Sequence, residues 1–263
     1  MTDQPVPPRR SDLSVRAVAG VAMIGIAAAA LYVGGFFFWV LVAIAAVFMM
    51  AEWADLHHVA YNDKRIAQFA LFVPVAIMAP IAAGPGFLAL GLVAGAAFFT
   101  VIVTRRPGLA HGIVYVGLPV LALLLLRDQP QGRLLSFWAM ALVWACDIGA
   151  YFAGRSIGGP KLAPTISPNK TWAGLIGGVI AATFFGAVLQ QFGLPLHLVL
   201  ATPLLAVLAQ MGDLYESQLK RRAGVKDSGN VLPGHGGVLD RLDGLVPVAP
   251  AAALMVELAK ITT

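Results

Sequence analysis

The chain has 263 residues, of which 59% are hydrophobic and 12% are charged, and its mean hydropathy is +0.82. Because soluble domains contain about 25% charged residues, this composition excludes an ordinary soluble domain and predicts an integral membrane protein. The formal net charge is +5, but the basic residues form short clusters between apolar runs, which excludes the continuous basic face of a nucleic-acid-binding protein. The single cysteine, Cys146, excludes internal disulfides and cysteine metal clusters.

Nine apolar segments have the composition and approximate length of a membrane-spanning helix, which needs roughly 17 to 25 mostly apolar residues. In chain order they are Leu13–Tyr32, Phe36–Ala51, Ile66–Ala83, Phe87–Val103, Gly112–Leu126, Leu134–Ala153, Trp172–Gln190, Leu196–Met211 and Leu245–Ala259. The first could instead be a signal peptide, since arginines precede it, but the apolar run continues through Gly34 and Gly35 into the second segment. The sequence therefore predicts an all-α polytopic membrane protein with about nine transmembrane helices.

The loops between these segments differ sharply in charge. With the N-terminus in the cytoplasm, 15 of the 18 Lys and Arg residues lie on the cytoplasmic side, and only Arg127, Arg133 and Lys260 lie outside. The positive-inside rule favours this arrangement, so we expect a cytoplasmic N-terminus and an external C-terminus. Because polar residues concentrate in the second half, we expect a transmembrane scaffold over residues 1–126. Residues 127–263 would form the catalytic region, with cytoplasmic loops 154–171 and 212–244.

Two polar features come before the longest loop. Asp147 lies late in the sixth apolar segment, where a carboxylate is costly and often marks function; the alternative is a solvated residue at headgroup level. In the next loop, Ser167 is expected to cap a helix that begins near Pro168 or Asn169. Free N–H groups at that helix end, together with Lys170, would suit an anion. An ordinary cap beside a positive-inside charge is the alternative.

The longest polar passage of the chain runs from Gly212 to Asp243. Asp213, Glu216, Ser217 and Lys220 would share one face if the eighth helix continues past the membrane. The glycine-rich run 226–237 cannot be helical and could form a backbone cradle for phosphate. Asp240 and Asp243, three residues apart, can share a divalent cation; acids favoured by a helix N-terminus are the alternative.

The residues from Ser217 to Asp243 resemble the signature of the phosphatidate cytidylyltransferases, or CDP-diacylglycerol synthases, over 27 consecutive positions. The segments Asp147–Arg155 and Ser167–Gly174 are also similar to that family. Two positions depart from it, because Ile148 stands where the family usually has a small hydroxyl residue and Ala173 where it commonly has an acidic one. The resemblance implies a Mg²⁺-dependent reaction, with a second cation as an option, of CTP and phosphatidate to CDP-diacylglycerol and pyrophosphate. It also implies a bacterial inner-membrane protein whose site faces the cytoplasm.

The resemblance and the residue chemistry together assign the candidate site residues. The predicted metal ligands are Asp213, Asp240, Asp243 and Asp147, and the predicted catalytic residues are Lys226, Asp227, Arg241 and Asp243. The predicted substrate-binding residues are Ser167, Asn169, Lys170, Ser217, Lys220, Arg221, Gly229, Gly234, His235, Gly236 and Gly237. The role of His235 stays open between metal ligand, proton carrier and loop residue. The expected partners are CTP and the membrane lipid phosphatidate, without nucleic acid, and the chain could form a homodimer.

Two other functions compete with this reading. A related CTP-dependent membrane kinase that acts on a polyprenol or phytol would use similar chemistry, but it would not need the complete 27-residue signature. An ion or solute transporter would carry ionisable groups near mid-membrane in both halves of a repeat. Here these groups cluster at one face and in one half of the chain, which favours the enzyme.

Overall fold

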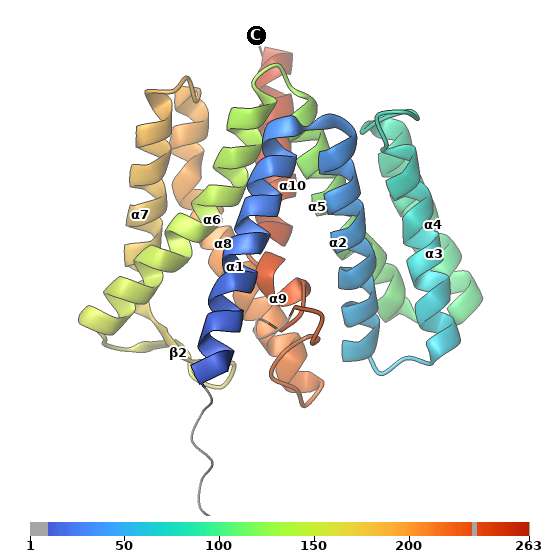
Figure 1. The fold of residues 1–263 in the computed structure, drawn as a ribbon, viewed down its shortest axis with the longest axis horizontal. Helices are drawn as coiled ribbons and strands as arrows, with labels where there is room; N and C mark the ends of the chain where they lie inside the picture. Colours follow the sequence, from blue (N-terminus) through green and yellow to red (C-terminus); the bar gives the residue numbers. More distant parts are fainter. Residues whose placement is uncertain (1–9, 233–235, 263) are drawn as a thin grey trace, which may run out of the picture.

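The protein is a bundle of long helices with one short hairpin, and the computed structural model describes residues 10–232 and 236–262. The long helices are α1 (Arg10–Val33), α2 (Gly35–Leu56), α3 (Tyr61–Ile77), α4 (Phe87–Thr104), α5 (Pro107–Asp128), α6 (Gly132–Ser156), α7 (Trp172–Gln190), α8 (Leu196–Arg222) and α10 (Leu245–Thr262). The short elements are β1 (Lys161–Ala163), β2 (Ser167–Thr171) and the one-turn helix α9 (Leu239–Leu242). In Figure 1, α1 begins at the lower end of the bundle and α10 ends at the upper end.

Each of the nine predicted apolar segments overlaps one of the long helices. Among the described residues, six helices are long and apolar enough to cross a membrane, namely α2, α4, α5, α6, α7 and α8. Apolar side chains also cover the outside of the bundle, because Phe98, Phe184 and Leu200 are about 70% exposed. An apolar exterior of this kind needs lipid as its solvent. The chain is therefore an integral membrane protein, while the count of nine spans and the sides of the termini stay predictions.

The helices α6 and α7 approach each other through small residues. A Cβ atom added at Gly149 would lie 2.4 Å from the Cβ of Ala181, and one added at Gly177 would lie 2.2 Å from the Cβ of Ala153. Small residues let membrane helices pack with their backbones close together. This contact fixes the ends of α6 and α7 and hence the hairpin between them.

The hairpin corrects the prediction for this loop only, because the protein is otherwise helical, in agreement with the predicted all-α fold class. β1 and β2 pair in antiparallel fashion, with Lys161 opposite Thr171, so no helix begins at Pro168 or Asn169. Thr171 caps α7 instead, because its hydroxyl accepts a hydrogen bond from the Gly174 N–H at 3.0 Å. The physical reason is that Pro168 favours an extended residue before it, while Thr171 offers a capping hydroxyl just before the apolar run.

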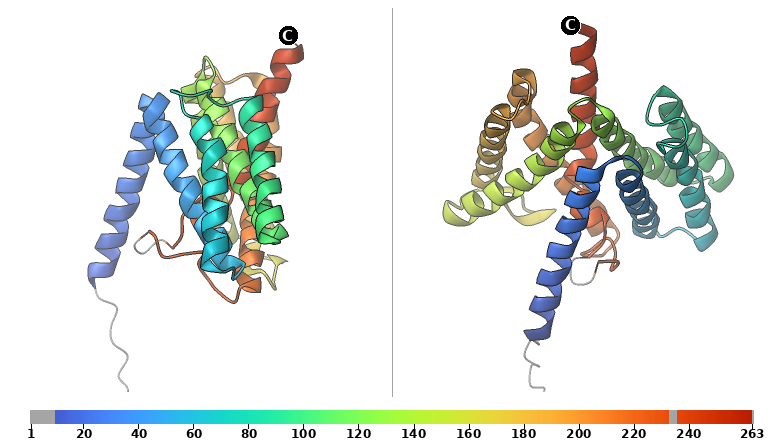
Figure 2. Two further views of the ribbon diagram at one scale, coloured as in Figure 1. Left: turned by 90° about the vertical axis from the view of Figure 1, so that its right-hand side faces the viewer. Right: turned by 45° about the horizontal axis from the view of Figure 1, so that its top comes forward.

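The loops that carry the predicted site residues lie at one end of the bundle. Figure 1 shows the hairpin, the far end of α8 and α9 at the lower end, near the end of α2. The helix α8 continues to Arg222, which confirms that the eighth helix extends past its apolar segment. Figure 2 shows α1 at the outside of the bundle, where it contacts mainly α2 and α6.

Candidate active site

The end of α8 presents a line of polar side chains to the candidate site. Ser217 Oγ donates a hydrogen bond to Asp213 Oδ1 at 3.3 Å, and Lys220 Nζ lies 3.6 Å from Glu216 Oε2. The predicted common face of these four residues is therefore confirmed. It turns toward α9 and toward the polar loop, which we define as residues 223–232 and 236–238.

Glu52, at the end of α2, holds this loop from the other half of the chain. Its side chain is buried, and its carboxylate accepts hydrogen bonds from the backbone N–H groups of Val238 at 2.9 Å and Leu239 at 2.8 Å. The Ser228 hydroxyl lies 3.1 Å from the same carboxylate. These contacts satisfy N–H groups at the start of α9 that have no partner within the helix. Glu52 thus caps α9 from a distant helix.

Sequence reasoning missed Glu52. The predicted apolar segment ends at Ala51, one residue before Glu52, whereas α2 continues to Leu56. The available signal was an acidic residue at the end of an apolar run, because ionisable residues within membrane helices are rare and usually functional.

Asp240, in α9, also holds the polar loop in place through hydrogen bonds. Its carboxylate accepts hydrogen bonds from Lys220 Nζ at 2.6 Å, from the backbone N–H groups of Ser228 and Gly237 at 2.8 Å each, and lies 3.0 Å from the Ser228 hydroxyl. Burial by itself raises the pKa of Asp240, but the hydrogen bonds from Lys220 and the two backbone N–H groups outweigh it and hold that pKa below its usual value. The carboxylate already has several donors of its own, and its predicted metal ligation stays a prediction.

The glycines of the loop allow its backbone to close over these two carboxylates. A Cβ atom at Gly229 would lie 2.8 Å from Glu52 Oε1, and one at Gly237 would lie 2.5 Å from Glu52 Oε2. Gly236 has a φ of +82°, which favours glycine. The N–H groups of Gly237 and its neighbours thus point at protein carboxylates, where the sequence suggested a cradle for phosphate. Gly234 and His235 lie outside the described residues.

We expect the substitution Gly237→Ala to open this loop, because the new Cβ atom would lie 2.2 Å from Ser228 Oγ as well as against Glu52. Overpacking of this kind costs about 1–3 kcal/mol, so catalytic activity should fall at least about 5-fold. Hydrogen–deuterium exchange of the loop should rise while exchange in the long helices stays unchanged. The control Gly91→Ala in α4 meets open space and should leave activity and exchange unchanged. Wild-type exchange in Gly237→Ala would contradict the packing argument.

The hairpin folds onto α8 through charged contacts. Lys170 Nζ, on β2, pairs with Asp213 Oδ2 at 2.5 Å, and Arg221 Nε donates to the Ile166 carbonyl at 3.5 Å. One helical turn before Asp213, Gln210 Nε2 donates to Asp147 Oδ1 at 3.3 Å. These contacts bring predicted residues from three separate segments to one place.

Buried acids without enough donors lie at the centre of the site. The Glu216 side chain is fully buried, neither of its oxygens accepts a hydrogen bond within the described part of the chain, and it lies within hydrogen-bonding reach of Asp243. Burial, and then the negative charge of Asp213, raise the pKa of Asp243 to about 6. The charges of Asp213 and Asp243 also act on Asp147. Since buried carboxylates need a compensating charge, this cluster calls for a cation in addition to Lys170 and Lys220.

The chemistry of the cluster fits a divalent metal ion. Oxygen ligands from carboxylates are those that Mg²⁺ prefers, and Asp147, Asp213 and Asp243 were predicted as ligands from the sequence. Glu216 joins them through the structure. Across residues 10–232 and 236–262, no three such side chains already converge in a metal-holding arrangement. Some movement of these acids is therefore needed before they share one ion.

Several predicted residues lie outside this cluster. Lys226, Asp227 and Arg241 have exposed side chains on the polar loop and α9, and Asn169 is exposed on β2, while Ser167 is half-buried. Their positions at the open side of the site suit contact with a ligand that arrives from water. Their assigned catalytic and binding roles stay predictions.

Comparison with known proteins agrees with these observations. The sequence model of the cytidylyltransferase family matches residues 14–259. The chain is 41% identical over 251 residues to a protein of Brucella suis biovar 1 (strain 1330) named phosphatidate cytidylyltransferase, with 91% of each chain covered. Proteins of the same name from Bacillus subtilis (strain 168) and Rickettsia felis (strain ATCC VR-1525 / URRWXCal2) are 45% identical over 142 residues and 32% identical over 200 residues. The first covers 52% of this chain and 53% of the relative, and the second 71% and 88%. The resemblance inferred from the sequence is thereby confirmed.

Proposed function

The chain belongs to the cytidylyltransferase family and is a nucleotidyltransferase enzyme, and we propose that it converts CTP and phosphatidate to CDP-diacylglycerol and pyrophosphate in phospholipid biosynthesis. One observation carries the proposal. The segment that resembles the family signature forms a polar site at one end of a membrane bundle, with buried acids at its centre and basic side chains around them. Such a site can bind a soluble triphosphate and a lipid headgroup at the same depth relative to the membrane.

The proposed topology places this site in the cytoplasm. It has nine spans, with the N-terminus inside and the C-terminus outside, in a bacterial inner membrane. Support comes from the bundle itself, because α1 begins at the end that carries the site and α10 ends at the other (Figure 1). The basic loops lie at the end of the site, as the positive-inside rule favours for the cytoplasmic face. CTP would then reach the site directly.

The proposed reaction is an in-line displacement at phosphorus. An oxygen of the phosphatidate phosphate forms a bond to the α-phosphorus of CTP, the bond from that phosphorus to the β-phosphate oxygen breaks, and pyrophosphate leaves with the bonding electron pair. Because an ionised phosphate is already a nucleophile, the protein needs no strong general base. Its contribution is to position the two anions and to neutralise their charge.

The proposed role of each residue follows from its position in the site. Lys226, Arg221 and Arg241, at the exposed rim, would bind the triphosphate and the departing pyrophosphate. Ser167, Asn169 and Lys170, on β2, would bind the lipid phosphate. Lys220 would act through the loop, since its ammonium group holds Asp240 at 2.6 Å.

The buried acids at the centre of the site are the proposed ligands of a divalent cation. Asp147, Asp213, Glu216 and Asp243 would hold it, with Asp240 as a further ligand, and a second cation could share the same acids. A bound Mg²⁺ would supply positive charge to the phosphates as negative charge shifts to the leaving group. The supporting observation is the buried Glu216 carboxylate, which lacks a hydrogen-bond donor among the described residues.

A labelling experiment tests the reaction. Purified protein would be given phosphatidate, Mg²⁺ and CTP labelled with ³²P at either the α or the γ position. The α-label should become extractable into the lipid phase, and the γ-label should appear only in pyrophosphate. In a parallel assay with a polyprenol or phytol in place of phosphatidate, transfer of the γ-label to that acceptor would establish the related kinase and overturn the proposal.

A further inference from the structure

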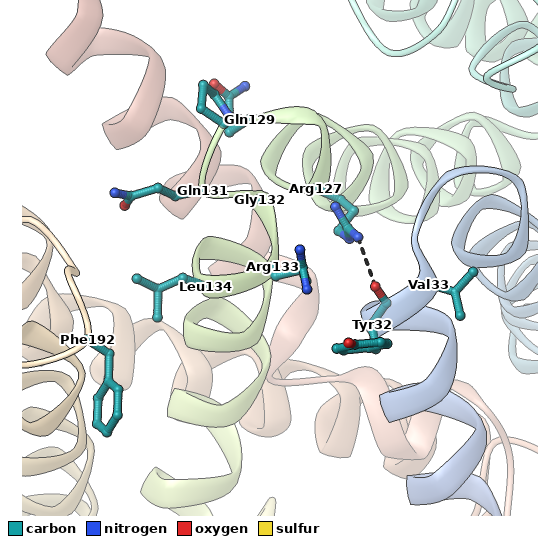
Figure 3. Close-up of a pocket in the computed structure, with 10 residues that line it drawn as sticks. Tyr32, Val33, Arg127, Gln129, Gln131, Gly132, Arg133, Leu134 and Phe192 are labelled. Carbon is teal, nitrogen blue, oxygen red and sulfur yellow. Dashed lines mark hydrogen bonds between the residues drawn. The ribbon is translucent and has the colours of Figure 1, made fainter.

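A cavity lies at the end of the bundle opposite the candidate active site. Its volume is about 640 Å³, and Figure 3 shows it between the end of α1 and the connection from α5 to α6. It is lined by Tyr32, Val33, Arg127, Gln129, Pro130, Gln131, Gly132, Arg133, Leu134 and Phe192. Two of its residues are arginines, and they are two of the three basic residues that the charge pattern places outside the cytoplasm.

Arg127 is held in place by the end of α1. Its Nε donates to the Leu31 carbonyl at 2.9 Å and its Nη2 donates to the Tyr32 carbonyl at 3.4 Å, the bond drawn in Figure 3. These are carbonyls of the last turn of a helix, which have no partner within it. The remaining N–H groups of the guanidinium, which has five donors in all, stay available to a ligand.

Arg133 has no carboxylate partner in the described part of the chain. Its guanidinium carbon lies 5.3 Å from the centre of the Tyr32 ring, and neither it nor Arg127 forms an ion pair among the described residues. The charge of Asp128 also acts on Arg127, but no carboxylate among the described residues lines the cavity. Two guanidinium groups in such a cavity form a site for an anion, and arginine binds phosphate well.

An apolar groove continues from this cavity between α1 and α6. Its volume is about 450 Å³ and it shares Tyr32, Arg133 and Leu134 with the cavity. Its other lining residues are Ile24, Ala27, Ala28, Leu31, Phe137, Met140 and Trp144. From Tyr32 back to Ile24 the groove follows about 12 Å of helix, at about 1.5 Å per residue. That length is most of the roughly 15 Å hydrocarbon depth of one leaflet.

We propose that this composite site binds an anionic glycerophospholipid of the leaflet opposite the catalytic site. The phosphate would lie between Arg127 and Arg133, and one acyl chain would fill the groove between α1 and α6. Both halves of the proposal rest on complementarity, because unpaired cations lie at headgroup level and apolar side chains lie at the depth of the chains. The proposal is independent of the catalysed reaction, since this lipid would not be the substrate.

The lipid would fill the space between α1 and the rest of the bundle and so hold α1 in place. The helix α1 contacts mainly α2 and α6, so a ligand in the groove adds contacts that protein side chains do not supply. A bound lipid of this kind stabilises the folded protein by an amount that rises with the logarithm of its concentration relative to its Kd.

The test measures lipid binding to the full-length protein by native mass spectrometry and by thermal unfolding in detergent. Dioleoylphosphatidylglycerol should bind one per chain and raise Tm more than dioleoylphosphatidylcholine does. Arg133→Gln should weaken phosphatidylglycerol binding at least 10-fold, and Ala28→Trp should do the same by filling the groove. The matched control is Lys260→Gln, which removes one positive charge at the same end but outside the cavity and should bind as wild type.

Three results would overturn the proposal. Equal phosphatidylglycerol binding by Arg133→Gln and Lys260→Gln would show that the cavity takes no headgroup. Equal stabilisation by inorganic phosphate would show that the groove holds no chain. A dimer that Ala28→Trp dissociates, with lipid binding unchanged, would show that a second copy of the chain occupies the groove.

Discussion

Replacing Asp243 with asparagine is expected to lower kcat by about 10²–10³-fold, the range found when one group that stabilises transition-state charge is removed. The substitution should leave the loop folded, because the Gly244 N–H donates to Asp243 Oδ1 at 2.7 Å and an asparagine carbonyl oxygen can accept the same bond. What is lost is the negative charge beside the buried Glu216 carboxylate. The rate measured against Mg²⁺ concentration should show a higher Mg²⁺ requirement in the variant.

Asp240→Asn is the informative comparison. Asp240 lies three residues before Asp243, and its substitution should lower activity for a different reason. Lys220 donates to one oxygen of Asp240, and two backbone N–H groups donate to the other. In either orientation the new amide NH₂ would therefore face a donor and leave the loop partly unsatisfied. Hydrogen exchange of the loop should rise in Asp240→Asn and stay at the wild-type level in Asp243→Asn. Near-wild-type turnover of Asp243→Asn at low Mg²⁺ would refute the role of Asp243 in holding the cation.

The sequence predicts what depends on composition and local spacing. The nine apolar segments fall on helices because hydropathy alone determines which segments a membrane can accept. The common face of Asp213, Glu216 and Lys220 follows from helical spacing once α8 continues to Arg222. The sequence analysis also assigned Lys170 and Asp213 to one site, and the structure pairs them.

The sequence did not predict contacts between distant segments. Glu52 reaches the polar loop across more than 170 positions, since it lies within hydrogen-bond distance of Ser228, and no local pattern signals such a partner. The same limit explains why the loop glycines suggested a phosphate cradle. Glycine spacing shows that the backbone can approach an anion, but it does not tell whether that anion is a substrate or a protein carboxylate. The hairpin was missed because Ser167 carries a capping hydroxyl just before Pro168, which suggested a helix start there. The strand pairing instead keeps residues 167–171 extended and leaves the cap to Thr171.

Replacing Glu52 with leucine is expected to lower activity by at least about 100-fold, although Glu52 lies in the scaffold half of the chain. The variant leaves the N–H groups of Val238 and Leu239 buried without their acceptor, and hydrogen bonds to a charged group are worth about 1.5–3 kcal/mol each. Because the lost bonds fix the start of α9, Asp240 and Asp243 lose their position relative to α8. Exchange of the Val238 and Leu239 amides should rise, while the helical circular dichroism stays at the wild-type level.

A graded pair of variants separates this positioning role from a general loss of stability. In Glu52→Gln the side chain keeps its size and one acceptor oxygen, but its NH₂ group faces one of the backbone donors, so a loss of about 10-fold is expected for roughly 1.4 kcal/mol. The matched control is Asp55→Asn, one turn along α2, whose carboxylate is 58% exposed and pairs with Lys64; exposed pairs of this kind contribute about 0–1 kcal/mol. Activity should therefore fall in the order Asp55→Asn, Glu52→Gln, Glu52→Leu, with loop exchange rising in the same order. If Glu52→Leu kept both its activity and its loop protection, the polar loop would owe its shape to Asp240 alone, and the scaffold half of the chain would contribute nothing to the site.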